Sequence, residues 1–317
     1  MHIAVLTEKR YVGDGAHSGK PPAYVANVLL EDRLVVEALT DEGCHVIRVA
    51  WCDKEVEWNR VDSALFRTTW DYFDRWSEFS LWLTRTAQST TLFNSPEILF
   101  WNLDKHYLRD LASLNTRVVP TEFADCGDVR SLLSIAQSRG WNEVVVKPAI
   151  AGAAKDTFRI HVNTGAMFPA SAMGYEALWT SLVERQDMLV QPFLPDVVNS
   201  GELSLVWIDG LVTHAVSKHA KTGDFRVQDD HGGAVRIHHI QPDEWSFATQ
   251  AMKACQAHCQ QLGWPEPLYA RVDMVRDLEG AWAISELEMV EPELWFRHHP
   301  PAAHALAKAL TRRMNQR

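Results

Sequence analysis

The chain has 317 residues, of which 46% are hydrophobic and 23% are charged, a composition typical of a globular protein of one to three domains. Its formal net charge of −10 disfavours a general nucleic-acid binder, which would carry a basic patch. The apolar run at the N-terminus is too short for a signal peptide, and no apolar stretch reaches the length of a membrane span. The five cysteines are typical of a reducing compartment, so we expect a cytoplasmic protein that binds neither membrane nor nucleic acid.

The first part of the chain predicts an open parallel sheet. Three short apolar runs are predicted as strands: residues 2–7, 45–51 and 61–67. A polar, glycine-containing loop over 8–22 follows the first strand, and the periodicity predicts a helix over 31–41. Strand, helix and strand at this spacing are typical of a βαβ unit, whose strands are parallel. A helix over 78–88 and the segment 92–112 complete an N-terminal α/β domain that we place at 1–118.

The stretch RTTWDYFDRW leaves the third predicted strand at its carboxyl end, where open α/β sheets bind ligands. Arg67 offers a fork of donors for a carboxylate, and Asp71 can hold an ammonium group. Trp70 and Tyr72 can form the walls of a small pocket. We therefore expect these four residues to bind the acyl substrate. The alternative is that Arg67 and Asp71 pair with each other at the domain surface.

From about residue 118 onward the pattern changes to a mixture of helices and hairpin strands. Helices are predicted over 129–138, 174–186, 243–262 and 302–313. Strands are predicted over 143–150, 158–162, 188–194, 203–208 and 211–219. The last two strands are joined by Asp209 and Gly210, which are typical of a two-residue hairpin turn.

Two basic segments are candidate anion sites. Lys147 ends an otherwise apolar strand, a costly position unless its ammonium reaches a partner or water. The small side chains of 151–157 allow backbone N–H groups to approach an anion closely, and Lys155 adds charge there. Arg226 lies in a loop over 222–233, where it can pair with a phosphate or a carboxylate. From these residues alone, surface lysines at a turn and a solvated arginine remain open alternatives.

Residues 268–288 predict an antiparallel hairpin around the turn at 277–280. A loop of two or four residues would place six side chains on one face: Tyr269, Arg271, Asp273, Ile284, Glu286 and Glu288. Ser285 and Leu287 would then back the apolar face, and a three-residue loop would break this register. Three carboxylates packed this closely repel unless a cation lies between them, and their hard oxygens suit Mg²⁺. The alternative is a solvated, charge-rich sheet face with Arg271 as the counter-ion.

Taken in order, eight stretches of the chain resemble the ATP-grasp superfamily on its glutathione synthetase side. They are RTTWDYFDR, NSPEILFWNLDK, VVVKPAIAGAAKDT, VQPFL, GELSLV, DFRVQDDHGG, ARVD and ELEMVEP. The resemblance covers nearly the whole chain and is nearest to the group containing the ATP-grasp enzyme that forms the D-cycloserine ring. It implies an N-terminal α/β domain followed by a two-part ATP-grasp fold at 119–317, with a lid subdomain at 119–190 and a metal-binding, catalytic subdomain at 191–317.

The resemblance also implies roles for individual residues. Those expected at the nucleotide are Lys105 and Lys147 on the phosphates, Gly152 and Lys155 in a mobile lid loop, Gln191, Pro192 and Phe193 at the adenine, and Glu202 nearby. Those expected to bind Mg²⁺ are Asp273, Glu286 and Glu288. Those expected to stabilise the transferring phosphoryl group are Arg226 and Arg271, and those expected to contact the substrate include Gly232 and Gly233. Glu288 departs from glutathione synthetases, which carry Asn as the last metal ligand.

The implied chemistry is formation of a C–N bond that depends on ATP and on Mg²⁺, with two metal ions. A substrate carboxylate attacks the γ-phosphate, and an amine then displaces phosphate from the acyl phosphate. Our first interpretation is intermolecular ligation of an amino acid or a peptide. The alternatives are intramolecular cyclisation of an amino-acid derivative and a nucleotide-binding regulator without turnover. A homo-oligomer is compatible with the sequence.

Overall fold

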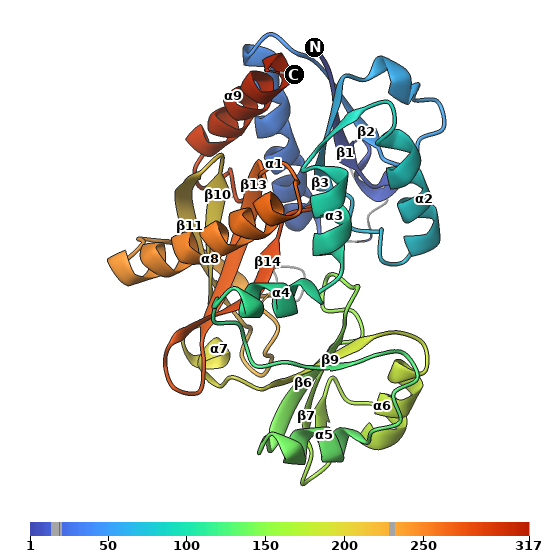
Figure 1. The fold of residues 1–317 in the computed structure, drawn as a ribbon, viewed down its shortest axis with the longest axis vertical. Helices are drawn as coiled ribbons and strands as arrows, with labels where there is room; N and C mark the ends of the chain where they lie inside the picture. The colour runs from blue at the N-terminus through green and yellow to red at the C-terminus, as the bar shows by residue number, and fades with distance from the viewer. Residues whose placement is uncertain (14–18, 20, 228–231, 317) are drawn as a thin grey trace.

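The structure is a computed structural model that describes residues 1–13, 19, 21–227 and 232–316. Its strands form three sheets, one of four strands and two of five strands. In Figure 1 the four-stranded sheet and one five-stranded sheet lie in the upper part of the molecule, and the other five-stranded sheet lies below them. The predicted fold class, with a parallel N-terminal sheet and a mixed α+β module, is confirmed.

The first sheet is parallel, as the βαβ pattern predicts. Its strands, in spatial order, are β2 (His45–Ala50), β1 (His2–Thr7), β3 (Ser63–Thr68) and β4 (Thr91–Phe93). Its helices are α1 (Pro22–Asp41) and α2 (Trp76–Thr86), with 3-10 turns at Lys9–Tyr11 and Trp58–Arg60. Helix α1 begins earlier than predicted, because Pro22 occupies the start of the helix, where its missing N–H costs nothing. Tyr24 and Val25 therefore belong to the first helical turn.

A helical segment connects the first sheet to the other two. After β4 come α3 (Pro96–Leu103) and α4 (Tyr107–Ser113), with Lys105 in the link between them. Asn102 Nδ2 donates to Leu287 O at 2.5 Å, and Leu287 N donates to the Tyr107 hydroxyl at 2.8 Å. Because Leu287 lies between Glu286 and Glu288, these bonds hold Lys105 beside the predicted carboxylates.

The second sheet is antiparallel and carries the predicted lid loop. Its strands, in spatial order, are β5 (Glu122–Ala124), β9 (Met188–Pro192), β6 (Glu143–Pro148), β7 (Phe158–His161) and β8 (Ala166–Phe168). Its helices α5 (Leu132–Ser138) and α6 (Tyr175–Val183) pack on it through one apolar cluster. Val144 and Val146 of β6 belong to that cluster, so Val145 and Lys147 point to the opposite face. Strand β9 continues past the predicted subdomain boundary at residue 190.

The third sheet is also antiparallel. Its strands, in spatial order, are β12 (Ala234–His238), β11 (Leu211–His219), β10 (Glu202–Ile208), β13 (Tyr269–Arg276) and β14 (Trp282–Glu288). The helices in this part are α7 (Asp196–Asn199), α8 (Pro242–Gln261) and α9 (Pro301–Asn315). Helix α8 covers the face that carries Val272 and Met274, which leaves the face of Arg271 for other contacts. The predicted turn at Asp209 and Gly210 is confirmed, because both residues have positive φ, 49° and 93°.

The β13–β14 hairpin places the predicted charged side chains on one face. Arg271 pairs with Glu288 and Asp273 pairs with Glu286, so these four side chains share one face as predicted. The loop nevertheless spans five residues, 277–281, and an odd loop by itself would break that register. A bulge in β14 inserts one residue and restores it.

The bulge residue is Ser285, and it changes the position of its neighbour. Ile284 pairs with Met274 and is buried among apolar side chains, so its predicted place beside the carboxylates is wrong. Ser285, predicted to back the apolar face, instead donates to Glu202 Oε2 at 2.9 Å. The physical reason is that a bulge inserts one residue, so side chains before and after it alternate between the two faces of the sheet in opposite order.

The first and third sheets share one apolar core. Ile3 and Leu65 of the first sheet pack in the same cluster as Tyr269 and Trp295. Helix α9 lies along α1, so the C-terminal helix covers the N-terminal domain (Figure 1). Within the described residues, no helix is long and apolar enough to cross a membrane.

Candidate active site

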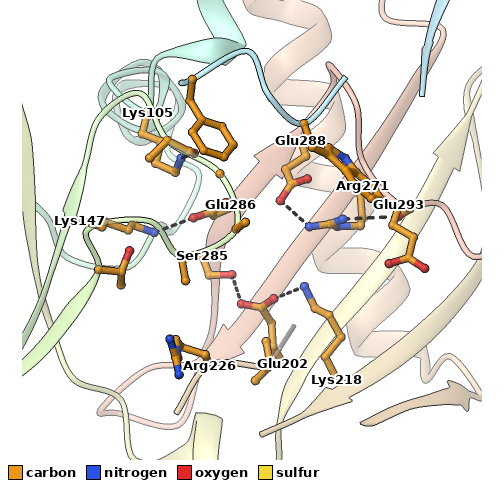
Figure 2. Close-up of a pocket in the computed structure, with 18 of the residues that line it drawn as sticks. Lys105, Lys147, Glu202, Lys218, Arg226, Arg271, Ser285, Glu286, Glu288 and Glu293 are labelled. Atoms are coloured by element: carbon orange, nitrogen blue, oxygen red, sulfur yellow. Dashed lines mark hydrogen bonds and ion pairs between the residues drawn. The ribbon is translucent and has the colours of Figure 1, made fainter. Parts of the chain in front are cut away.

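A cavity of about 430 Å³ lies where elements of all three sheets meet. The predicted site residues that line it are Trp70, Tyr72, Lys105, Lys147, Gly152, Gln191, Pro192, Phe193, Glu202, Arg226, Arg271, Glu286 and Glu288. The predicted site residues that do not line it are Arg67, Asp71, Lys155, Gly232, Gly233 and Asp273. Figure 2 shows the charged members from the α3–α4 link, β6, β10, β11 and the β13–β14 hairpin pointing into one space.

Two lysines enter the cavity from the side of the second sheet. Lys147, on β6, places Nζ 2.8 Å from Glu286 Oε1 (Figure 2). Lys105 Nζ donates to Ala151 O at 2.7 Å, and its backbone N donates to Ala149 O at 2.9 Å. Burial raises the pKa of Glu286, but the charges of Lys147 and Lys105 more than offset it and hold that pKa below its ordinary value. The two ammonium groups therefore converge on one point, as binding of a polyphosphate requires.

The loop 151–157 closes one side of the cavity by contact with the N-terminal domain. Lys155 forms an ion pair with Asp74, and its Nζ lies 5.5 Å from the centre of the Phe73 ring. A Cβ on Gly152 would lie 2.8 Å from Phe73 Cε1, so the close approach depends on glycine. The ammonium of Lys155 is engaged by Asp74 across the domain boundary, so its contact with a nucleotide stays a prediction.

The end of β9 forms a flat, aromatic wall of the cavity. Gln191, Pro192 and Phe193 all line it. The guanidinium of Arg159 lies 3.5 Å from the centre of the Phe193 ring, and Phe225 packs edge-on against the same ring at 6.4 Å. A slot bounded by ring faces and backbone accepts a planar heterocycle.

Glu202 and Lys218 form a charged pair inside the cavity. They lie opposite each other on β10 and β11 and form an ion pair, and Glu202 also accepts from Ser285 (Figure 2). Lys218 also lies 3.1 Å from Asp273 Oδ2, where burial opposes its charge but Asp273 and Glu202 raise its pKa overall. Sequence analysis missed Lys218. A lysine beyond the apolar centre of a strand, in register with the only acid of the neighbouring strand, is the signal that could have found it.

Arg271 and Glu288 form the ion pair at the far end of the hairpin (Figure 2). Burial, together with the charges of Asp273 and Glu286, raises the pKa of Glu288 to about 7, although Arg271 acts against them. A carboxylate whose ionised form is disfavoured in this way would be stabilised by a bound cation.

Asp273 is placed differently from the two glutamates of β14. Only 2% of the residue is exposed, and it does not line the cavity. Its Oδ1 accepts from Ser204 Oγ at 2.5 Å and from Arg271 Nε at 2.9 Å. Its Oδ2 accepts from Arg271 Nη2 at 2.7 Å and from Lys218 Nζ at 3.1 Å. In this structure Asp273 is thus the counter-ion of two cations, and the predicted metal binding would require it to release one of them.

Two residues predicted to bind substrate lie outside the cavity. Arg67 is 1% exposed, and its Nη1 donates to Pro292 O at 3.1 Å. Asp71 accepts from Arg75 Nη1 at 2.7 Å. Neither residue lines the cavity in this arrangement, so their contact with a substrate stays a prediction, whereas the alternative that they pair with each other is wrong. The reason is that β3 continues to Thr68, so Arg67 still lies inside the sheet and not beyond its end.

Trp70 and Tyr72 line the cavity, as predicted for pocket walls. Trp70 Nε1 donates to Glu291 O at 3.0 Å, and its indole packs edge-on against Tyr11 at 5.8 Å. Burial raises the pKa of the Tyr72 hydroxyl well above its ordinary value, and the charge of Glu291 adds to this effect. The loop after β3 therefore closes the cavity with aromatic surface.

Arg226 and the two glycines of the stretch DFRVQDDHGG are separated in space. Arg226 lines the cavity, where its Nη2 donates to Asp224 Oδ2 at 2.7 Å. In Figure 2 Arg226 lies below Glu286 and Arg271 lies to its right, so the two predicted cations approach from different directions. Residues 228–231 lie outside the described residues. Gly232 and Gly233 do not line the cavity, so the substrate contact of these glycines stays a prediction.

Sequence analysis also missed Glu8, directly after β1. Glu8 lines the cavity and its Oε2 accepts from Arg10 Nη2 at 2.8 Å. Its Oε1 is buried and has no hydrogen-bond partner among the described residues. Burial raises the pKa of this carboxyl, and the opposing charge of Arg10 does not cancel that effect. Its position at the carboxyl end of a central parallel strand is the signal that could have found it.

Glu291 is a second missed carboxylate. It lines the cavity, and within the described ranges no other residue donates a hydrogen bond to its side chain or forms an ion pair with it. Burial, together with the charge of Glu288, raises its pKa to about 8. The end of the cavity that is lined by Trp70 and Tyr72, predicted to bind the acyl substrate and called the acyl end below, therefore holds two carboxylates with unused acceptor capacity, Glu8 and Glu291.

The cavity-facing carboxylates fit a divalent cation. Glu286 and Glu288 project from the same face of β14 into the space between Lys147 and Arg271 (Figure 2). One or two carboxylates beside bound phosphates are the surroundings that Mg²⁺ prefers, because it keeps part of its water shell. Burial, with the charges of Asp273 and Glu286, raises the pKa of Glu288, and a bound cation would offset these effects.

The parallel N-terminal sheet, the lid sheet and the cavity with paired lysines and carboxylates together define an ATP-grasp ligase. Residues 174–263 match the RimK-like ATP-grasp domain, and residues 3–94 match the N-terminal domain of D-cycloserine synthetase DcsG. The chain is 30% identical over 294 residues to the cycloserine biosynthesis protein DcsG of Streptomyces lavendulae, which covers 86% of this chain and 92% of the relative. The chain therefore belongs to the ATP-grasp ligases related to DcsG.

Solved structures agree with this family. The crystal structure of D-cycloserine synthetase DcsG superposes with a TM-score of 0.82 at 26% identity, over 99% of this chain and 100% of that chain. The D-alanine–D-alanine ligase of Bacillus anthracis has a TM-score of 0.64 at 13% identity, over 100% and 98% of the two chains, and shares the fold. The predicted ATP-grasp resemblance and the prediction of an ATP-dependent, C–N bond-forming ligase are confirmed.

Proposed function

We propose that this ligase uses ATP and Mg²⁺ to activate the carboxylate of a small α-amino-acid derivative, and that a nitrogen of the same molecule then closes a ring. The support for ring closure is the N-terminal domain, which walls the acyl end of the cavity and matches the D-cycloserine synthetase N-terminal domain. A cytoplasmic location remains part of the proposal, supported by five free cysteines.

The observation that carries the substrate class is the buried carboxylate of Glu8. Its Oε1 has no partner among the described residues although it lies at a cavity wall. A buried acceptor left unpaired costs about 1–3 kcal/mol, more when it is charged, so a ligand donor is the natural partner. The ammonium group of an amino acid is a donor of the right charge, and Tyr11 and Trp70 bound the space around it.

The residues that would hold Mg²⁺ are Glu286 and Glu288, joined by Asp273 if it releases Lys218 or Arg271. Two ions fit this set best, because three carboxylates are more than one Mg²⁺ bound to phosphates requires. When bound, Mg²⁺ would neutralise charge on the phosphates during phosphoryl transfer.

The chain's own residues bind, orient and exclude water. Lys105 and Lys147 would exchange Ala151 O and Glu286 for phosphate oxygens, and the slot at Phe193 would receive the adenine. The substrate carboxylate oxygen attacks the γ-phosphorus and ADP leaves; the nitrogen then attacks the acyl carbon and inorganic phosphate leaves. Closure of 151–157 by Lys155 and its partner Asp74 keeps water from the acyl phosphate.

The test is ADP release with ureido-amino acids of both configurations, each supplied without a second amine, with mass spectrometry of the product. Ring closure predicts ADP release that saturates with one substrate and a product lighter than the substrate. Absence of ADP release with every small amino-acid derivative would contradict the proposal.

Intermolecular ligation of amino acids or peptides is the competing interpretation, and the same assay separates it. Ligation predicts that ADP release requires a second amine and that the product is heavier than either substrate. Both reactions use the same acyl phosphate, so the distinction lies only in where the nitrogen comes from.

A further inference from the structure

Residues 289–293 form an irregular segment, called the strap below, that leads from the end of β14 into the acyl end of the cavity. Each of its carbonyls accepts from a side chain: Met289 O from Asn94 Nδ2 at 2.7 Å, Val290 O from the Tyr269 hydroxyl at 2.6 Å, Glu291 O from Trp70 Nε1 at 3.0 Å, Pro292 O from Arg67 Nη1 at 3.1 Å and Glu293 O from Arg271 Nη1 at 3.4 Å. Carbonyls outside helices and sheets have no regular backbone partner and need another donor when they are buried. Five consecutive side-chain donors therefore hold this strap with unusual rigidity.

The strap carries one acidic side chain that the contacts described above leave unused. Glu293 is paired with Arg297, whereas the carboxylate of Glu291 faces the cavity without a hydrogen bond to another described residue. The strap backbone is fixed by five side-chain donors, and the Glu291 carboxylate that it carries faces the cavity without a partner. This arrangement is expected of a preorganised functional group.

We propose that Glu291 binds the nucleophilic nitrogen of the substrate and accepts its proton during C–N bond formation. The proposal rests on the proposed function, since it requires an acyl phosphate in the same cavity. The nitrogen lone pair forms the bond to the acyl carbon, the C–O bond to phosphorus-bound oxygen breaks, and inorganic phosphate leaves with that electron pair. The N–H proton passes to a carboxylate oxygen of Glu291, so charge and atoms balance.

The surroundings of Glu291 suit a proton acceptor near neutral pH. Its charged neighbours come from three elements: Glu288 at the end of β14, Lys105 in the α3–α4 link and Arg271 on β13. Two hydroxyl groups also feel its charge, those of Tyr72 and Tyr269. The raised pKa of about 8 supports the geometry, because a general base works best when its pKa lies near the working pH.

The proposal also gives Arg67 and Trp70 a role. Arg67 Nη1 donates to Pro292 O and Trp70 Nε1 donates to Glu291 O, so both act as positioning residues for Glu291. Trp70→Phe keeps the aromatic surface and removes only the N–H that holds Glu291 O. Because the indole also bounds the substrate pocket, this variant should slow C–N bond formation by a larger factor than it slows formation of the acyl phosphate.

The experiment separates the two chemical steps with hydroxylamine, which attacks acyl phosphates without help from an enzyme base. Hydroxamate formation reports the first step, and the C–N product reports the second. Glu291→Gln should lower the product rate by about 100-fold or more, the usual contribution of a general base, and leave the hydroxamate rate within about threefold of wild type. Glu291→Asp should recover part of the product rate. The product rate of the wild type should rise with pH as Glu291 ionises, and this rise should be absent in Glu291→Gln.

Two outcomes would overturn the inference. One is a wild-type product rate in Glu291→Gln, and the other is an equal loss of hydroxamate and product, which would place Glu291 in the first step or in folding. Failure of the proposed function looks different, because the wild-type enzyme itself would then release no ADP with ureido-amino acids.

Discussion

Replacement of Glu8 by Gln tests where the amino acid binds. Glu8 Oε1 is buried at the cavity wall without a partner among the described residues, and Oε2 is held by Arg10. If a substrate ammonium completes this site, the variant loses a charge-assisted hydrogen bond worth about 1.5–3 kcal/mol. That range corresponds to a rise in KM of roughly 10-fold to 150-fold, since each 1.4 kcal/mol is tenfold.

The same variant should fold normally. The side chain of Arg10 is 47% exposed, so its ion pair with Glu8 contributes little to the free energy of unfolding. Removal of a buried charge whose pKa is raised offsets that small loss, because Glu8 is desolvated in the folded state. We therefore expect a melting temperature within a few degrees of wild type and an unchanged Kd for Mg·ATP, whose proposed site lies at Lys105 and Lys147.

Steady-state kinetics of ADP release against amino-acid concentration would measure the change in KM, with calorimetry for the Kd of ATP. Asp71→Asn is a matched control, because Asp71 lies on the same domain but is engaged by Trp51 and Arg75 outside the cavity. The reasoning is refuted if Glu8→Gln leaves KM unchanged, or if Asp71→Asn raises it by the same factor.

Three further predictions follow from the charged and titrating groups. Lys147→Met should weaken Mg·ATP binding about tenfold or more in calorimetry. It should also lower the melting temperature, because Lys147 neutralises the charge of Glu286. An unchanged affinity would show that Lys147 does not bind phosphate. Lys155→Ala should leave the melting temperature nearly unchanged, because the ion pair with Asp74 is exposed. It should raise the ratio of ADP to product, because water would then reach the acyl phosphate. A constant ratio would contradict the proposal that this ion pair keeps the loop 151–157 closed. Burial lowers the pKa of His214 from 6.5 to about 4, so the folded state binds fewer protons than the unfolded state between these pH values. The folded state should therefore lose up to about 3 kcal/mol of stability as pH falls from 6.5 to 4. Urea titrations of His214→Gln should not show this loss.

The sequence predicts those parts of the fold where a local pattern and the tertiary structure agree. The parallel sheet follows from apolar runs at βαβ spacing, and the Asp209–Gly210 turn from residues that tolerate positive φ. The first turns of α1 could not be recognised, because Pro21 and Pro22 are as typical of a loop as of a helix start. What decides between them is burial of Val25 and Val28, which depends on contacts distant in sequence.

The site was predictable where chemistry is tied to a motif and not where it depends on strand ends. Lys105, Lys147, Glu286 and Glu288 meet in one cavity, as the resemblance implies. Arg67 was misplaced because one additional residue of β3 turns a surface arginine into a buried one. Glu8 follows the carboxyl end of β1, the position that Arg67 was expected to have after its own strand, but no motif marks Glu8 in the sequence.

The hairpin shows how a correct prediction can rest on an incorrect step. The expected register requires an even loop, and the actual loop spans five residues at 277–281, which would turn Glu286 and Glu288 toward α8. One inserted residue in β14, Ser285, reverses the parity a second time, so both glutamates return to the cavity. Neither irregularity has a strong sequence signal, because the turn residues suit several loop lengths and a serine in a strand does not by itself indicate a bulge. Ser285 contributes a hydroxyl to Glu202, however, and a regular strand with an even loop would bury that hydroxyl under α8. The bulge therefore does more than correct the register: it adds a donor to the site and separates the face that binds charge from the face that packs.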